Sequence, residues 1–244
     1  MKTSWLIRIL ILLVLVVFLM TPQSFAPLFA PFTRHNAPAI YNQGSLLDIT
    51  LSHLWITALA TFASTVIAVG LAILVTRPSG AEFLPLSRSI ANIGQTFPPV
   101  AVLALAIPIL GFGTEPTLVA LFLYALLPIL ENSITGLTNV PRNVHEAARG
   151  MGMTGWQQLI KVELPLAFPV MLTGIRIAAI VSLSTATIGS TVAAKTLGEV
   201  IIAGLTTNNT AFVLQGGIIV GICAVLINDF LLSLEKWLQP QPVE

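Results

Sequence analysis

Charged residues are scarce in this chain of 244 residues, at 9% of the composition, whereas hydrophobic residues make up 55%. A soluble domain carries about 25% charged residues because its surface faces water. The shortage excludes a soluble enzyme and a disordered protein, and it leaves an integral membrane protein. The net charge of +1 is too small to indicate nucleic-acid binding. The single cysteine, Cys223, excludes an intrachain disulfide, and we expect it to pack as an apolar residue.

Long stretches without charge predict an all-α membrane protein with six transmembrane helices. A helix rises about 1.5 Å per residue, so each stretch is long enough to cross a hydrocarbon core of about 30 Å. The predicted spans are residues 5–20, 52–76, 90–110, 116–135, 172–191 and 211–232.

The distribution of lysine and arginine predicts the orientation. With the N-terminus inside, eight of the 11 basic residues fall in cytoplasmic segments, Arg34 and Lys195 fall outside, and Arg176 lies within a span. This asymmetry places both termini in the cytoplasm.

The first span has a second interpretation. Lys2 and Arg8 precede an apolar run and the triplet Ser24-Phe25-Ala26, a pattern that also occurs in cleaved signal peptides. We favour a retained helix, because Pro27 would follow the cleavage site directly. Removal of the helix would also leave five spans with the N-terminus outside.

The longest predicted cytoplasmic loop covers residues 136–166, and its part 139–165 is called the EAA loop below. Its sequence predicts two short helices, the first capped by Asn139 and ended by a turn at Gly152, where glycine permits a positive φ. Thr154 and Gln157 have the spacing of a capping box for the second helix. Pro165 is expected to stop that helix before the next span.

A second pattern runs through the same loop: a Glu-Ala-Ala triplet, three residues, Gly, nine residues, an aliphatic residue, one residue and Leu-Pro. This pattern resembles the EAA loop of type I ABC importer permeases, with valine in place of the usual isoleucine. The resemblance implies a permease with a cytoplasmic coupling helix that docks on a separate ATPase subunit. The matching residues are Glu146, Ala147, Ala148, Gly152, Val162, Leu164 and Pro165.

Five further segments are similar to the glycine betaine/carnitine/choline branch of these permeases, and the likeness extends over residues 52–229. The resemblance implies import of quaternary-amine osmoprotectants. Two departures stand out: Lys195 lies where the branch has a glycine-rich run, and Glu131 lies where many members have a basic residue. The similar segments are residues 95–99, 127–132, 150–154, 162–167 and 174–176.

The resemblance also implies the partners. Two cytoplasmic ATPase subunits would bind ATP and Mg, a periplasmic or extracellular binding protein would deliver the solute, and a second copy or a paralogue would complete the membrane pair. We expect no catalytic residue, metal or cofactor in this chain. Its nearest approach to a phosphate loop, residues 189–196, has Ala194 in place of the second glycine, although converging backbone N–H groups are needed there.

Candidates for the transport pathway come from polar and helix-breaking residues within the predicted spans. Prolines break helices and broken helices often line cavities, while hydroxyl residues serve either close packing or a polar lining. Arg176 is expected to pair with Glu131 or Asp229, and His53 and Trp55 to mark the membrane interface. The candidates are Gln95, Phe97, Pro98, Pro99, Arg176, Ser184 and Thr187.

The predicted organisation has three parts: residues 1–48 with the first helix and an outer loop, residues 49–235 as the permease transmembrane domain, and residues 236–244 as a cytoplasmic tail. The sequence thus predicts a permease of the bacterial inner membrane that imports glycine betaine or a related solute. Import of another small solute, such as an amino acid, and an ATP-independent channel or membrane scaffold remain as alternatives.

Overall fold

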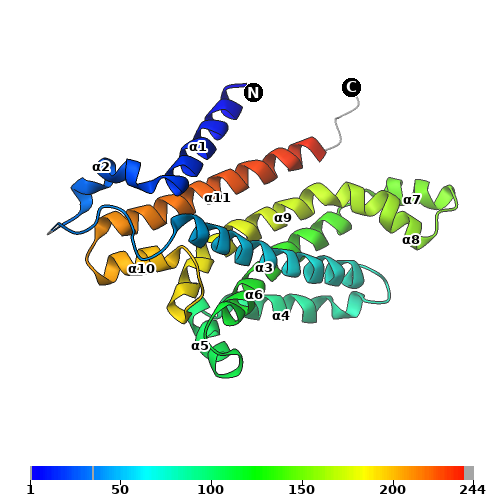
Figure 1. Ribbon diagram of the computed structural model, residues 1–244. Coiled ribbons are helices and arrows are strands. Elements are labelled where there is room, and N and C mark those ends of the chain that lie inside the picture. The colour runs from blue at the N-terminus through cyan, green and yellow to red at the C-terminus, as the bar shows by residue number, and fades with distance from the viewer. Residues whose placement is uncertain (1, 35, 239–244) are drawn as a thin grey trace. The chain divides into compact units, whose positions relative to one another are not determined.

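The computed structural model describes residues 2–34 and 36–238, and within them the chain is helical with no strand (Figure 1). The α-helices are α1 (Lys2–Met20), α2 (Ala26–Phe29), α3 (Leu46–Val75), α4 (Leu84–Thr96), α5 (Pro99–Leu110), α6 (Thr114–Thr138), α7 (Arg142–Gly150), α8 (Gly155–Gln158), α9 (Leu164–Thr185), α10 (Gly198–Thr206) and α11 (Thr210–Leu238). Shorter segments are the 3-10 turns η1 (Pro22–Phe25), η2 (Ala30–Phe32), η3 (Ala81–Phe83) and η5 (Ala186–Val192) and the π-helical turn η4 (Leu159–Glu163).

Four helical stretches of the described residues are long and apolar enough to cross a membrane, namely α3, α6, α11 and the continuous stretch Gly155–Val192. Two bent helix pairs raise the number of spans to six if each pair is one span. The predicted count of six therefore agrees with the upper number. α11 extends to Leu238, and residues 239–244 of the predicted tail lie outside the described residues.

The fifth predicted span, residues 172–191, is too short at its N-terminal end, because Pro165 does not stop the preceding helix. α8 leads through the π turn η4 directly into α9, which begins at Leu164. In this turn the N–H of Leu164 donates to the carbonyl oxygen of Leu159, five residues back. Pro165 therefore lies at the second position of α9, directly after the π turn, and the helical stretch continues past it.

The third predicted span is broken in the middle. α4 ends at Thr96 and α5 begins at Pro99, so the helix is interrupted at residues 97 and 98. Pro98 and Pro99 have no N–H groups, so an uninterrupted helix would lose two consecutive backbone hydrogen bonds here. The first span also continues past Met20 into a second short helical stretch, Pro22–Phe32, bent by 110°. Part of the predicted outer loop is therefore helical.

The chain divides into two compact units, each with its own apolar core. Unit 1 comprises residues 1–59, 99–121 and 182–228, and its fully buried side chains include Leu183, Leu197 and Ile219. Unit 2 comprises residues 60–98, 122–181 and 229–244, with Ile129 and Leu130 of α6 buried in its core. The EAA loop belongs to unit 2.

Close packing of α6 and α9 within unit 2 depends on glycine. A Cβ atom on Gly174 of α9 would lie 2.6 Å from the carbonyl oxygen of Pro128 and 2.7 Å from the Cβ of Asn132. A Cβ on Gly136 of α6 would lie 2.9 Å from the carbonyl oxygen of Ala167. Both approaches are too close for any larger residue, and such contacts through small residues are typical of membrane helix packing.

Candidate functional site

The first helix of the EAA loop is α7, and it lies at the end of α9 together with α8 (Figure 1). Its N-cap is Pro141, whose carbonyl oxygen accepts from the N–H groups of Val144 and His145, and no side chain caps it. The prediction that Asn139 caps this helix is therefore wrong. The helix begins three residues later than Asn139, so that side chain is too far from the N2 and N3 amides.

A Schellman motif ends α7 at the predicted glycine. The N–H of Met153 donates to the carbonyl oxygen of Ala148 at 3.1 Å, and the N–H of Gly152 donates to that of Arg149 at 2.9 Å. Gly152 has a φ of +75°, a conformation that costs other residues about 1–2 kcal/mol. The positive-φ turn predicted from the sequence is confirmed.

The capping box that starts α8 is also confirmed. The N–H of Gln157 donates to Oγ1 of Thr154 at 3.3 Å, and the N–H of Thr154 donates to Oε1 of Gln157 at 2.9 Å. Two amides at the helix start are thereby satisfied. The turn between α7 and α8 is thus fixed on both sides.

The Glu-Ala-Ala triplet is divided between two faces of α7. Glu146 and Ala147 are exposed, whereas Ala148 is buried against the protein itself. Glu146 forms an exposed ion pair with Arg142, one turn before it, with Nε and Oε1 3.0 Å apart. Further along the loop, Pro165 is exposed, and Val162 and Leu164 are half-buried.

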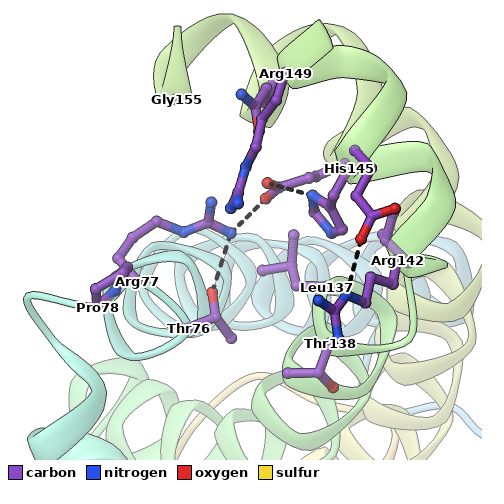
Figure 2. Close-up of a pocket in the computed structure, with 13 residues that line it drawn as sticks. Thr76, Arg77, Pro78, Leu137, Thr138, Arg142, His145, Arg149 and Gly155 are labelled. Atoms are coloured by element: carbon purple, nitrogen blue, oxygen red, sulfur yellow. Dashed lines mark hydrogen bonds and ion pairs between the residues drawn. The ribbon is translucent and has the colours of Figure 1, made fainter. Parts of the chain in front are cut away.

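A cavity of about 850 Å³ with several charged side chains in its wall lies beneath α7 and α8 (Figure 2). Its lining comes from the ends of α3 and α6 and from the EAA loop, and it includes the basic side chains of Arg77, Arg142 and Arg149. Figure 2 shows Arg77 and His145 meeting the same carboxylate, which belongs to Glu163. Sequence reasoning missed Glu163, although a carboxylate beside an apolar Leu-Pro pair is itself a signal of a partner.

Two of the pathway candidates surround the break between α4 and α5. The side chain of Gln95 donates from Nε2 to the carbonyl oxygen of Tyr124 at 2.8 Å. The hydroxyl of Tyr124 donates in return to the carbonyl oxygen of Phe97, a group that a continuous helix would satisfy internally. Pro98 and Pro99 form the break itself. Tyr124 of α6 is a contact that the sequence did not predict.

Arg176 does not pair with Glu131. Glu131 instead faces Arg88 of α4, with Nε and Oε1 2.9 Å apart. Arg176 contacts Glu235 near the end of α11, with Nε and Oε2 3.4 Å apart, and Thr173 donates to the other carboxylate oxygen at 3.0 Å. The sequence alone does not indicate which carboxylate faces Arg176, because that depends on how the helices are rotated.

The last two pathway candidates lie in one segment of unit 1. Thr187, in η5, donates from its hydroxyl to the carbonyl oxygen of Ser184 at 2.7 Å. Ser184 is exposed and Thr187 is half-buried.

His53 is not an interfacial residue as predicted, because it is fully buried. The N–H of Leu197 donates to its Nδ1 at 3.3 Å, so Nε2 carries the proton and donates to the carbonyl oxygen of Leu183 at 3.0 Å. Trp55 is exposed, which fits the predicted interfacial position.

A helical membrane domain that carries two short loop helices on a glycine turn has the architecture of an importer permease. The chain belongs to the family described as "Binding-protein-dependent transport system inner membrane component", which matches residues 68–242. It is therefore a multi-pass inner-membrane transport protein, as the EAA pattern predicts.

Curated relatives cover most of the chain. It is 39% identical to the osmoprotectant import permease protein OsmY of Salmonella typhimurium, over 82% of this chain and 85% of that protein. It is 38% identical to the glycine betaine/carnitine/choline transport system permease protein OpuCB of Bacillus subtilis, over 83% and 93%. Identity to the choline transport system permease protein OpuBB of the same organism is 40%, over 82% and 91%.

Solved structures agree with the fold. An inward facing structure of the MetNI methionine ABC transporter matches with a TM-score of 0.71 and 25% identity, over 80% of this chain and 96% of that chain. An amino acid ABC transporter crystallised with histidines matches with a TM-score of 0.65 and 18% identity, over 90% and 98%. The all-helical permease fold predicted from the sequence is confirmed.

Proposed function

We propose that this chain is the permease subunit of an ATP-driven importer of glycine betaine or related quaternary-amine osmoprotectants. Three relatives named for osmoprotectant, glycine betaine, carnitine or choline transport support this solute class, each at 38–40% identity over more than four fifths of the chain. The methionine transporter shares the fold at lower identity. It therefore supports an amino acid as the solute less strongly than these relatives support a quaternary amine.

The EAA loop is the proposed contact with the ATPase subunits. Its outer surface carries Glu146, Ala147 and two large apolar side chains, Met151 and Trp156, which are each 69% exposed. Exposed apolar groups on a polar loop are typical of a protein interface. A carboxylate beside a small residue suits a basic or N–H partner at close range.

The helical continuity of residues 155–192 carries this proposal. α8 leads through η4 into α9 without a break, so a displacement of α8 is passed directly to a membrane span. The Schellman turn at Gly152 and the capping box at Thr154 hold α7 against that helix. ATP-driven closure of the partner subunits would push on α7 and α8 and rock the spans between inward-open and outward-open states.

The remaining parts of the proposal concern orientation and pathway. Both termini and the EAA loop face the cytoplasm, while a second permease and a solute-binding protein complete the complex. The break at Pro98 and Pro99 acts as a gate, and Arg176, Ser184 and Thr187 line the path. ATP and Mg bind the partner subunits, and this chain supplies no catalytic group.

Reconstitution tests the proposal. The chain, co-purified with its ATPase and placed in proteoliposomes with its binding protein, is assayed for uptake of labelled glycine betaine, carnitine, choline and amino acids. ATP-dependent uptake of a quaternary amine is the expected result. Uptake of amino acids alone would reject the solute class, and uptake without ATP would reject the importer in favour of a channel.

A further inference from the structure

We propose that Glu163 is a positioning residue that ties the turn η4 of the EAA loop, beside α7, to the end of α3, so that a push on the loop moves two spans together. The proposal rests on the proposed function, since it concerns how ATP-driven motion is passed to the membrane helices. No residue of the Glu-Ala-Ala or Leu-Pro elements makes this connection.

The carboxylate of Glu163 is shared between two elements that are distant in the sequence. It forms an ion pair with Arg77, which follows α3 directly, and its other oxygen lies 3.6 Å from Nδ1 of His145 on α7. Glu163 is only 4% exposed, whereas these partners remain accessible from the cavity. One buried carboxylate therefore binds the residues after α3 to the turn before α9, and it lies beside α7 at more than hydrogen-bond distance (Figure 2).

Burial makes the Glu163 carboxylate dependent on its charged partner. A carboxylate removed from water is costly unless it is paired and hydrogen-bonded, so loss of one partner leaves an uncompensated charge. The exposed pair Arg142–Glu146 on the same helix differs, because its side chains are 91% and 63% exposed and such pairs contribute little. Of these two ion pairs, only that of Glu163 is able to hold the elements in register.

The π turn explains how Glu163 reaches its partners. η4 contains one residue more than an α-helical turn would, which rotates the chain by roughly 100° relative to an uninterrupted helix. Leu159 and Glu163, the first and last residues of the turn, are both buried, while Lys161 between them is exposed. π turns are frequent at functional sites.

Arg77 is attached firmly to α3. Thr76 beside it donates its hydroxyl back to the carbonyl oxygen of Ala72 at 2.8 Å, and Arg77 Nη2 lies 3.4 Å from that hydroxyl oxygen. A displacement of Glu163 is therefore passed to the backbone of α3 and not absorbed by a free side chain.

The test measures solute transported per ATP hydrolysed in the reconstituted full complex. We expect Glu163→Gln and Arg77→Gln each to lower this ratio by about five- to tenfold while ATP hydrolysis continues, at the lower end of the roughly 5–150-fold that is typical of a coupling between sites. The double variant should be no worse than Glu163→Gln alone, because Arg77→Gln removes only a contact that the Glu163 variant already lacks. Lys161→Gln, on the same turn but exposed, is the matched control and should keep the wild-type ratio.

The proposal is overturned if the ratio is unchanged in both single variants. It is also overturned if the losses add in the double variant, or if Lys161→Gln loses as much as the other variants. A parallel fall of ATP hydrolysis and uptake would also overturn it, since a merely structural role predicts that result. If Glu163→Gln fails to accumulate in the membrane, the ratio of Arg77→Gln decides, and Arg77→Lys, which keeps a charge for the single contact to Oε2, should retain more of the ratio than Arg77→Gln. Wild-type protein without ATP-dependent uptake would instead reject the proposed function, and this inference with it.

Discussion

Nε2 of His53 donates to the carbonyl oxygen of Leu183 at 3.0 Å, inside the apolar core of unit 1. Two residues after Leu183, α9 gives way to the 3-10 segment η5, so the backbone hydrogen bonds change pattern here. Nδ1 of the same ring accepts from the N–H of Leu197, which immediately precedes α10. One imidazole therefore fixes both ends of the segment that carries Ser184 and Thr187.

Replacement of His53 by phenylalanine should destabilise the protein by about 1–3 kcal/mol, because it leaves a buried carbonyl and a buried N–H without partners. The check is the midpoint of thermal unfolding in detergent. His53→Gln, which offers both a donor and an acceptor, should recover part of the loss. Equal stability of His53→Phe and wild type would show that the two hydrogen bonds contribute nothing.

The sequence predicted neither the burial of His53 nor its partners. A lone histidine near the end of an apolar run reads as interfacial, because both ring nitrogens usually need water. Its actual partners, Leu183 and Leu197, lie more than 120 residues away and become available only because the chain changes helix type. Side-chain contacts of this kind depend on tertiary structure and carry no local signal.

Tyr124→Phe should loosen the break between α4 and α5, since it removes the hydroxyl that satisfies the carbonyl oxygen of Phe97. A side-chain hydrogen bond in a helical membrane protein contributes on average roughly 0.6 kcal/mol, so labelling of a cysteine at position 97 should speed up by about threefold. The measurement uses a Cys223→Ala background, which leaves the introduced thiol alone. An unchanged labelling rate would show that the hydroxyl of Tyr124 does not stabilise the break.

Ala193 occupies a left-handed conformation, with a φ of +64°, at the end of η5. The left-handed conformation costs alanine about 1–2 kcal/mol of stability. Glycine avoids this strain, but its greater freedom in the unfolded chain costs roughly 0.5–1 kcal/mol. Ala193→Gly should therefore raise the thermal midpoint by about 1–4 °C. Ala194→Gly is the control and should lower it, because Ala194 is buried and lacks the positive φ. A lower midpoint for Ala193→Gly would contradict the strain.

Tyr41 ties residues before α3 to α10, as its hydroxyl donates to Oε1 of Glu199 at 2.8 Å. Tyr41→Phe should cost about 1 kcal/mol of stability, measured again as the thermal midpoint. Burial, together with Glu199, raises the pKa of Tyr41 above its ordinary value of 10.0. As the pH rises, the phenol of Tyr41 ionises in the unfolded chain before it ionises in the folded protein. The stability that the hydrogen bond to Glu199 contributes is therefore full below about pH 10 and decreases as the pH rises above that value. The difference between variant and wild type should stay constant from about pH 6 to about pH 9; a marked change across that range would contradict this ionisation state.

Two local signals in the EAA loop predict the structure, at Gly152 and Thr154, whereas the cap predicted at Asn139 does not form. The turn at Gly152 depends on a single φ, and the capping box at Thr154 depends on two neighbouring side chains. The stop predicted at Pro165 failed, because the rule assumes an α-helical bond pattern and the π turn before it changes that pattern. Glu163 was overlooked for the same reason, since its direction follows from the extra residue in the turn.

The most direct test of the account compares wild type, Gly152→Pro and Gly150→Ala for ATP-dependent glycine betaine uptake in proteoliposomes that hold equal amounts of each permease. Proline cannot adopt the φ of +75° at position 152, whereas Gly150 has an ordinary φ and open space around it. We predict that wild type and Gly150→Ala take up the solute only with ATP, and that Gly152→Pro loses at least about 90% of this uptake, an effect on the scale of 1.4 kcal/mol per tenfold change. Undiminished ATP-dependent uptake by Gly152→Pro would contradict the assignment of the EAA loop as the coupling element.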